Sequence, residues 1–217
     1  AAGALQNYTP ELAQAVREGE SKTDHYEDIL GTYLVKLSAL KISENDSSEA
    51  AMLLKTLSDF ERIGDHALNL VESAEELKSK NLALSDAARY ELSVLLRAVE
   101  EIVDMTFQAF RDDDLEKAYR VEPLEQVIDD LKEKMRIHHI LRMQQGSCGI
   151  EAGFIWSDLL TNLERVSDHC SNIACCMIEG ADHNLHRHEV LQSIRGSGEI
   201  FDREYSSYRQ KYALTAE

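Results

Sequence analysis

Apolar residues recur every three or four positions along most of this 217-residue chain, and short polar or glycine-containing stretches interrupt them. This spacing gathers apolar side chains on one face of a helix. The pattern therefore predicts an all-α protein with about six helices. We expect them over about 10–40, 48–80, 85–110, 114–145, 150–179 and 188–213.

Residues that begin or end helices mark the boundaries of these segments. Pro10 suits the first turn of the first helix, and Asn45–Ser48 offers a loop and N-cap for the second. Ser85 can cap the third helix, and the run Asp112–Asp114 separates the third from the fourth. Gly146–Gly149 predicts a turn before the fifth helix.

A polar pattern in the second predicted helix recurs in the fifth. Ser58-Asp-Phe-Glu-Arg-Ile-Gly-Asp-His66 corresponds to Thr161-Asn-Leu-Glu-Arg-Val-Ser-Asp-His169, about a hundred residues later. The polar residues shared by the two copies are Glu61, Arg62, Asp65, His66 and Asn69 in one, and Glu164, Arg165, Asp168, His169 and Asn172 in the other. This match indicates an internal duplication whose polar surface has a role.

The duplication also covers the helix that precedes each copy, since Glu20 and Glu27 correspond to Glu122 and Asp129. We therefore expect one domain made of repeat 1 (about 11–80), repeat 2 (about 85–180) and a C-terminal helix. The third predicted helix precedes the pair in repeat 2, and nothing equivalent precedes the pair in repeat 1. We expect two pseudo-symmetric three-helix bundles, in which the C-terminal helix (about 188–213) completes the first.

Each copy of the motif carries two carboxylates four residues apart, which point the same way on a helix. We call Glu61 and Asp65 the first carboxylate pair, and Glu164 and Asp168 the second. A helical wheel places both pairs at the edge of the apolar face. The same wheel places the histidine and asparagine of the motif further toward solvent.

The preceding helices supply further acidic residues, namely Glu20 and Asp24 in repeat 1 and Glu122 in repeat 2. If each acidic helix lies antiparallel to its partner, these carboxylates converge and would be neutralised by Mg²⁺, Ca²⁺, Mn²⁺, Zn²⁺ or iron. Gln126 stands where repeat 1 has Asp24, so we expect more metal at the first pair. A structural alternative remains, in which the arginine of each motif bridges the neighbouring acids without metal.

The composition narrows the function further. A formal net charge of −17 disfavours nucleic acid or an anionic membrane surface as a ligand, and favours cations or a basic protein partner. No apolar run is long enough to span a membrane, and the cysteine spacing fits reduced thiols in the cytoplasm.

No P-loop, G-x-S-x-G or H-E-x-x-H motif is present, so we expect that the protein is not an enzyme. His183, His186 and His188 form a cluster that we interpret as solvated rather than metal-binding.

With Glu-Arg-Ile-Gly-Asp-His and Glu-Arg-Val-Ser-Asp-His in both repeats, the sequence from about 11 to 180 resembles the PhoU family of phosphate-signalling proteins. The resemblance implies two three-helix bundles and paired E(D)xxxD motifs that hold metal ions. The family motif falls on both carboxylate pairs, and its acidic-helix positions fall on Glu20, Asp24 and Glu122. The missing first helix and the extra C-terminal helix are similar to the PhoU-like domain behind the membrane region of bacterial sodium-dependent phosphate cotransporters.

The resemblance implies a non-catalytic regulatory domain in phosphate transport or phosphate signalling. The expected partners are the membrane region of a phosphate transporter or phosphate-signalling proteins, and a homodimer is also compatible. We expect the domain in the cytoplasm, at the cytoplasmic face of the membrane. The alternative is a helical adaptor or scaffold protein that binds no metal.

Overall fold

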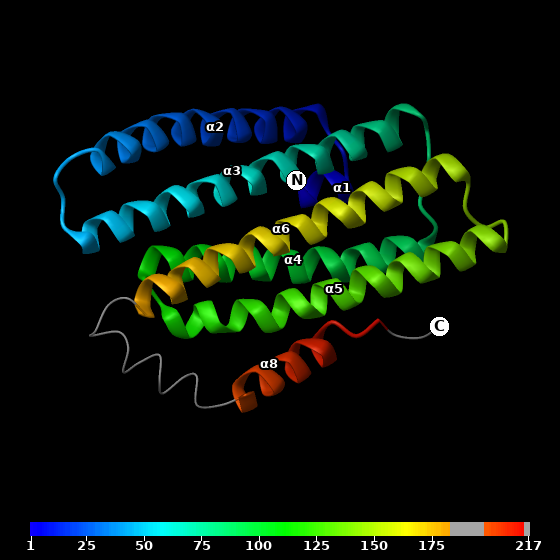
Figure 1. The fold of residues 1–217 in the computed structure, drawn as a ribbon. Coiled ribbons are helices and arrows are strands. Elements are labelled where there is room, and N and C mark those ends of the chain that lie inside the picture. The colour runs from blue at the N-terminus through cyan, green and yellow to red at the C-terminus, as the bar shows by residue number, and fades with distance from the viewer. Residues whose placement is uncertain (183–197, 215–217) are drawn as a thin grey trace.

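The computed structural model describes residues 1–182 and 198–214, and within these ranges the chain is helical without strands. The all-α prediction is confirmed. Figure 1 shows the long helices lying lengthwise beside one another. The helices are α1 (Ala2–Gln6), α2 (Pro10–Ser38), α3 (Glu44–Ser79), α4 (Asp86–Asp112), α5 (Leu115–Gln144), α6 (Ile150–Asp182) and α8 (Gly198–Lys211).

Side-chain caps fix most helix starts at or near the predicted positions. The side chain of Ser85 accepts a hydrogen bond from the backbone N–H of Ala88, and Asp114 caps α5 in the same way. α3 begins earlier than expected because Ser43, rather than a residue of 45–48, is its cap. Ser43 Oγ also donates to the Asp46 carboxylate at 2.7 Å, which closes the first turn.

The core lies mainly in repeat 2. Helices α4, α5 and α6 pack against one another and bury large side chains such as Leu95, Ile128 and Trp156. α3 packs along α6 and joins the two repeats, while α2 packs mainly against α3. The carboxylate pairs on α3 and α6 are therefore carried by the two helices at the centre of the molecule.

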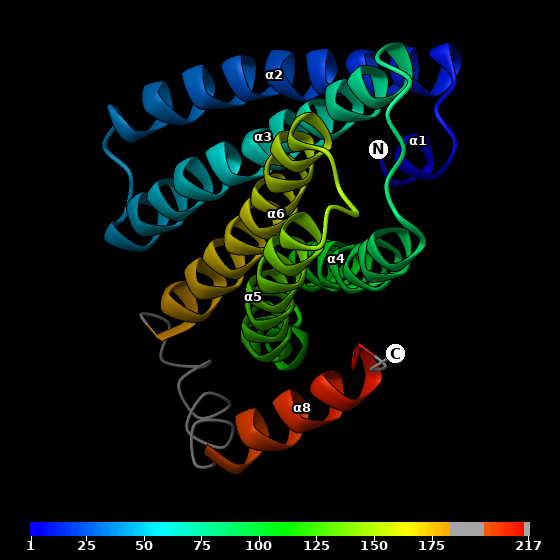
Figure 2. The same ribbon diagram turned by 90° about the vertical axis from the view of Figure 1, so that its right-hand side faces the viewer.

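The prediction that the C-terminal helix completes the first bundle is wrong for its described part. α8 packs against α5, on the side of the molecule away from α2 (Figure 2). Its tyrosines determine this position. Tyr205 Oη donates to Asp130 of α5 at 2.5 Å. Tyr212, directly after α8, donates through Oη to the backbone oxygen of Arg97 of α4 at 3.4 Å.

A short helix that the sequence did not predict, α1, lies beside the repeat 1 pair instead. Ala4 is buried against Ala13 of α2 and Val71 of α3, and Figure 2 shows α1 between α2 and α4. α1 has only five residues, so most of α2 has no third helix against it in the described structure. Tyr26 and Tyr33 of α2 are 60% and 61% exposed. None of the described helices is long and apolar enough to cross a membrane.

Candidate functional site

The first carboxylate pair lies on the side of α3 that faces α2. A Cβ atom placed on Gly64, between Glu61 and Asp65, would lie 3.8 Å from Thr23 Cβ of α2. Burial raises the pKa of Glu61 above its usual value, and the nearby charges of Asp65 and Glu27 raise it further. The antiparallel pairing of the acidic helix with the motif helix is therefore present in repeat 1.

The predicted acidic residues of α2 contribute unequally to this site. Glu20 is half-buried and Asp24 is exposed. Glu27, which follows one turn after Asp24, is the α2 carboxylate that acts on the pKa of Glu61. Glu27 is thus the residue through which α2 adds negative charge near the first carboxylate pair.

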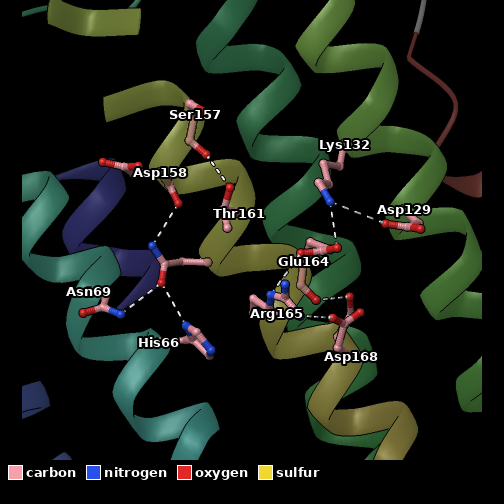
Figure 3. A network of polar contacts seen from close by, with 12 residues as sticks. His66, Asn69, Asp129, Lys132, Ser157, Asp158, Thr161, Glu164, Arg165 and Asp168 are labelled. Atoms are coloured by element: carbon pink, nitrogen blue, oxygen red, sulfur yellow. Dashed lines mark hydrogen bonds and ion pairs between the residues drawn. The ribbon is translucent and has the colours of Figure 1, made fainter. Parts of the chain in front are cut away.

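The second carboxylate pair lies on α6 opposite α5. Burial raises the pKa of Asp168, as do the charges of Glu164 and Asp129. Figure 3 shows Lys132 of α5 reaching toward Glu164, with Asp168 one turn along the same helix. Lys132 Nζ lies 2.7 Å from Glu164 Oε1 and 3.9 Å from Asp129 Oδ1. Glu122, the predicted α5 residue, accepts a hydrogen bond from the hydroxyl of Ser171 on α6.

Glu125 of α5 also belongs to this second site, and the sequence did not predict it. Burial raises its pKa from 4.5 to about 7, and the charges of Glu122, Asp129, Asp168 and Glu164 add to the effect. The corresponding residue of repeat 1 is a threonine, so the comparison of the two repeats gave no signal for Glu125. A group of like charges that holds one carboxyl partly protonated near neutral pH favours a bound cation.

The histidines of the two motifs are half-buried rather than directed to solvent, so that part of the prediction is wrong, whereas Asn69 and Asn172 are exposed as predicted. His66 Nδ1 lies 2.9 Å from Asn162 Oδ1 of α6. Reciprocally, His169 Nδ1 lies 2.8 Å from Asp59 Oδ1 of α3. The rings of the two histidines stack with centroids 5.5 Å apart. In the view of Figure 3, His66 lies on the other side of α6 from Glu164 and Asp168.

The asparagines complete this network between α3 and α6. Asn69 Nδ2 donates to Asn162 Oδ1 at 3.1 Å, and Asn172 Nδ2 donates to Asp59 Oδ1 at 3.2 Å. Position 59 and position 162 are equivalent in the two repeats, so the contacts follow an approximate two-fold relation. The motif therefore has two faces: the carboxylates face α2 or α5, and the histidine and asparagine join the repeats.

The arginine of each motif bridges its own carboxylate pair, as the structural alternative expects. Arg62 lies 3.3 Å from Asp65 and 3.6 Å from Glu61. Arg165 lies 3.2 Å from Asp168, and more than half of each arginine side chain is exposed. Exposed ion pairs of this kind are weak and exchange readily with other cations.

The donor atoms suit a hard cation, because carboxylate oxygens are the preferred ligands of Mg²⁺, Ca²⁺ and Mn²⁺. Among the described residues, however, no three carboxylate, imidazole or thiol groups are already gathered around one point. An ion would need exposed side chains to rotate, with Arg62 or Arg165 moving aside. The cluster of His183, His186 and His188 lies outside the described residues.

Comparison with known sequences and structures identifies the same family in both halves of the chain. The sequence model of the PhoU domain matches residues 1–74 and 92–177. The chain is also similar to the solved structure of PhoU from Pseudomonas aeruginosa. The TM-score is 0.78 at 24% identity, and the match covers 84% of this chain and 87% of that one. This likeness supports the helical fold.

Curated relatives are accessory proteins of phosphate transport by name. The chain is 27% identical to phosphate-specific transport system accessory protein PhoU homolog 1 of Thermotoga maritima, over 69% of this chain and 63% of that protein. The PhoU homolog of Deinococcus radiodurans is also 27% identical, over 80% of this chain and 81% of its own length. The chain thus spans less than two thirds of the Thermotoga relative.

Proposed function

The chain belongs to the PhoU family, and from this we propose that it is a non-catalytic regulatory domain in phosphate transport or phosphate signalling. Relatives named as accessory proteins of phosphate-specific transport support this proposal. Its partners would be the membrane region of a phosphate transporter or a phosphate-signalling protein. We propose that it acts at the cytoplasmic face of the membrane. Its partner there could be the membrane region of a sodium-dependent phosphate cotransporter.

We further propose that the carboxylate pairs bind metal ions, with iron, zinc, manganese, magnesium or calcium as candidates. The observation that carries this proposal is the position of Glu61 and Asp65 on the side of α3 that faces α2, where a Cβ atom on Gly64 would lie 3.8 Å from Thr23 Cβ. Burial and the charges of Asp65 and Glu27 raise the pKa of Glu61, which supports it. Carboxylates held near one another at the edge of a core are stabilised when a cation neutralises them. Residues Glu20, Asp24 and Glu122 on the acidic helices would contribute outer ligands.

Metal analysis of carboxylate variants tests this proposal. Glu61→Ala/Asp65→Ala is expected to lower the amount of Mn²⁺ or iron bound per chain after purification without chelator. Glu100→Ala/Asp104→Ala is a matched control, because these residues have the same spacing on α4, are exposed and lie outside both pairs. Equal loss of metal in both variants would contradict a specific site.

The metal-free adaptor is the second candidate, and the bridging of Asp65 by Arg62 favours it. An adaptor held together by these ion pairs would bind no metal, and its melting temperature would not change on addition of Mn²⁺ or Zn²⁺. A metal-binding domain would be stabilised in proportion to ion concentration and affinity.

Binding of the chain to a cotransporter membrane region in nanodiscs, with and without Mn²⁺, would then test whether metal controls the contact.

A further inference from the structure

The two carboxylate sites differ most clearly at one position of the acidic helices. The repeat register that equates Glu20 with Glu122 and Glu27 with Asp129 equates Leu30 of α2 with Lys132 of α5. Leu30 is 44% exposed and carries no charge. One repeat therefore has an ammonium group beside its carboxylate pair where the other has an aliphatic side chain.

The ammonium group of Lys132 is held within the second site. Its Nζ is 2.7 Å from Glu164 Oε1, and the two side chains are only 22% and 14% exposed. A half-enclosed pair at this distance is less screened by water than the exposed arginine bridges. The ammonium group of Lys132 therefore takes the place that a metal cation would occupy beside Glu164 and Asp129.

The number of carboxylates does not distinguish the two sites. Asp24 is replaced by Gln126 in repeat 2, but Thr23 is replaced by Glu125, so one gain offsets one loss. Both sites also keep the arginine of the motif. The acidic residues are Glu20, Asp24, Glu27, Glu61 and Asp65 in one site, and Glu122, Glu125, Asp129, Glu164 and Asp168 in the other. Lys132 adds a positive charge beside one of these sets, which its counterpart Leu30 does not carry. Further along the motif helices, Glu72 of α3 corresponds to Cys175 of α6.

We propose that Lys132 is a built-in counter-cation that excludes divalent metal from the second carboxylate site, so that the chain binds metal in repeat 1 alone. This inference rests on the proposed metal-binding function of the carboxylate pairs. An ammonium group at hydrogen-bond distance from Glu164 occupies one of its oxygens and repels a second cation. At the position of α2 that corresponds to Lys132, the first site has the uncharged Leu30 instead.

Exchanging the two residues tests the proposal directly. Mn²⁺ binding is measured by calorimetry and by elemental analysis for the wild type, Lys132→Leu, Leu30→Lys and the double exchange. Lys132→Leu is expected to gain a second binding event, with affinity at that site raised at least about tenfold. Leu30→Lys is expected to lose the original event, and the double exchange is expected to move binding from repeat 1 to repeat 2.

Variants of the carboxylates identify which site is filled. In the wild type, Glu61→Ala/Asp65→Ala is expected to remove the bound Mn²⁺, while Glu164→Ala/Asp168→Ala leaves it. Lys134→Leu removes an exposed positive charge from the same helix and is expected to leave binding unchanged. Lys132→Met replaces Lys132→Leu if circular dichroism shows that the latter is misfolded.

The outcomes separate this inference from the proposed function. Equal Mn²⁺ binding by both wild-type sites, or no gain in Lys132→Leu, would overturn the role of Lys132 while leaving metal binding in place. No Mn²⁺ bound by any variant would refute metal binding itself, and the inference with it. Loss of the wild-type ion in Glu164→Ala/Asp168→Ala alone would place metal in the wrong repeat and also overturn the proposal.

Discussion

Glu125→Gln is expected to stabilise the protein at alkaline pH and to have little effect near pH 5. Glu125 lies on α5, where burial and neighbouring carboxylates raise its pKa to about 7. Its negative charge is therefore unfavourable in the folded state. Glutamine keeps the shape of the side chain and removes that charge.

The size of the effect follows from the raised pKa. The change from 4.5 to about 7 corresponds to about 3 kcal/mol, at about 1.4 kcal/mol per pKa unit. Glu125 is only half-buried, so solvent screening reduces this to about 1–2 kcal/mol. Between pH 4.5 and 7 the folded state binds more protons than the unfolded state, so this contribution to stability is lost as the pH rises through that window.

Urea denaturation of the wild type and Glu125→Gln at several pH values measures this contribution, in chelator so that no ion neutralises the site. The variant is expected to be more stable by about 1–2 kcal/mol at pH 8, with the difference shrinking toward pH 5. Glu133→Gln, an exposed glutamate on the same helix, serves as control. A difference between wild type and Glu125→Gln that does not vary with pH would refute the reasoning.

Two further substitutions test the packing between helices. Asn162→Ala removes the amide oxygen that lies 2.9 Å from His66 Nδ1. In urea titrations, this variant is expected to lower the free energy of unfolding by about 1–3 kcal/mol. A loss below about 0.5 kcal/mol would contradict a structural role for this contact. Gly153→Ala would place Cβ 2.8 Å from His139 Nε2, so a loss of about 1–3 kcal/mol is expected. Gly19→Ala meets no atom within 4 Å and should be neutral or stabilising, which thermal melts of both variants would verify.

The helices themselves could be predicted because the residues that begin and end them act locally. Ser85 and Asp114 cap the helices that follow them, and each can be recognised without knowing the rest of the fold. α1 was missed because five residues are too few for a periodic pattern, and it has no side-chain cap. The position of α8 was wrong because an apolar face does not specify which groove it enters. Tyr205 and Tyr212 select that groove through acceptors on α5 and α4.

Only part of the site could be predicted, because the sequence does not show which neighbouring helix each side chain contacts. A helical wheel sorts residues relative to one apolar face, but α3 has α2 on one side and α6 on another. Glu61 was correctly placed at an edge, whereas His66, which lies on the α6 side, was assigned to solvent. Lys132 and Glu125 stand where the two copies differ, so identity between the repeats gives no signal for them.

The reciprocal contacts between α3 and α6 give the histidines of the repeated motif a structural role, separate from metal binding. His66 of α3 contacts Asn162 of α6, and His169 of α6 contacts Asp59 of α3. An approximate two-fold contact brings equivalent positions of both copies together, so matching histidines are expected there even in a protein that binds no metal. The carboxylates lie outside this contact, and the pKa of Glu61 is raised by burial and like charge, which a purely structural latch does not require. The case for metal therefore rests on the carboxylate pairs alone.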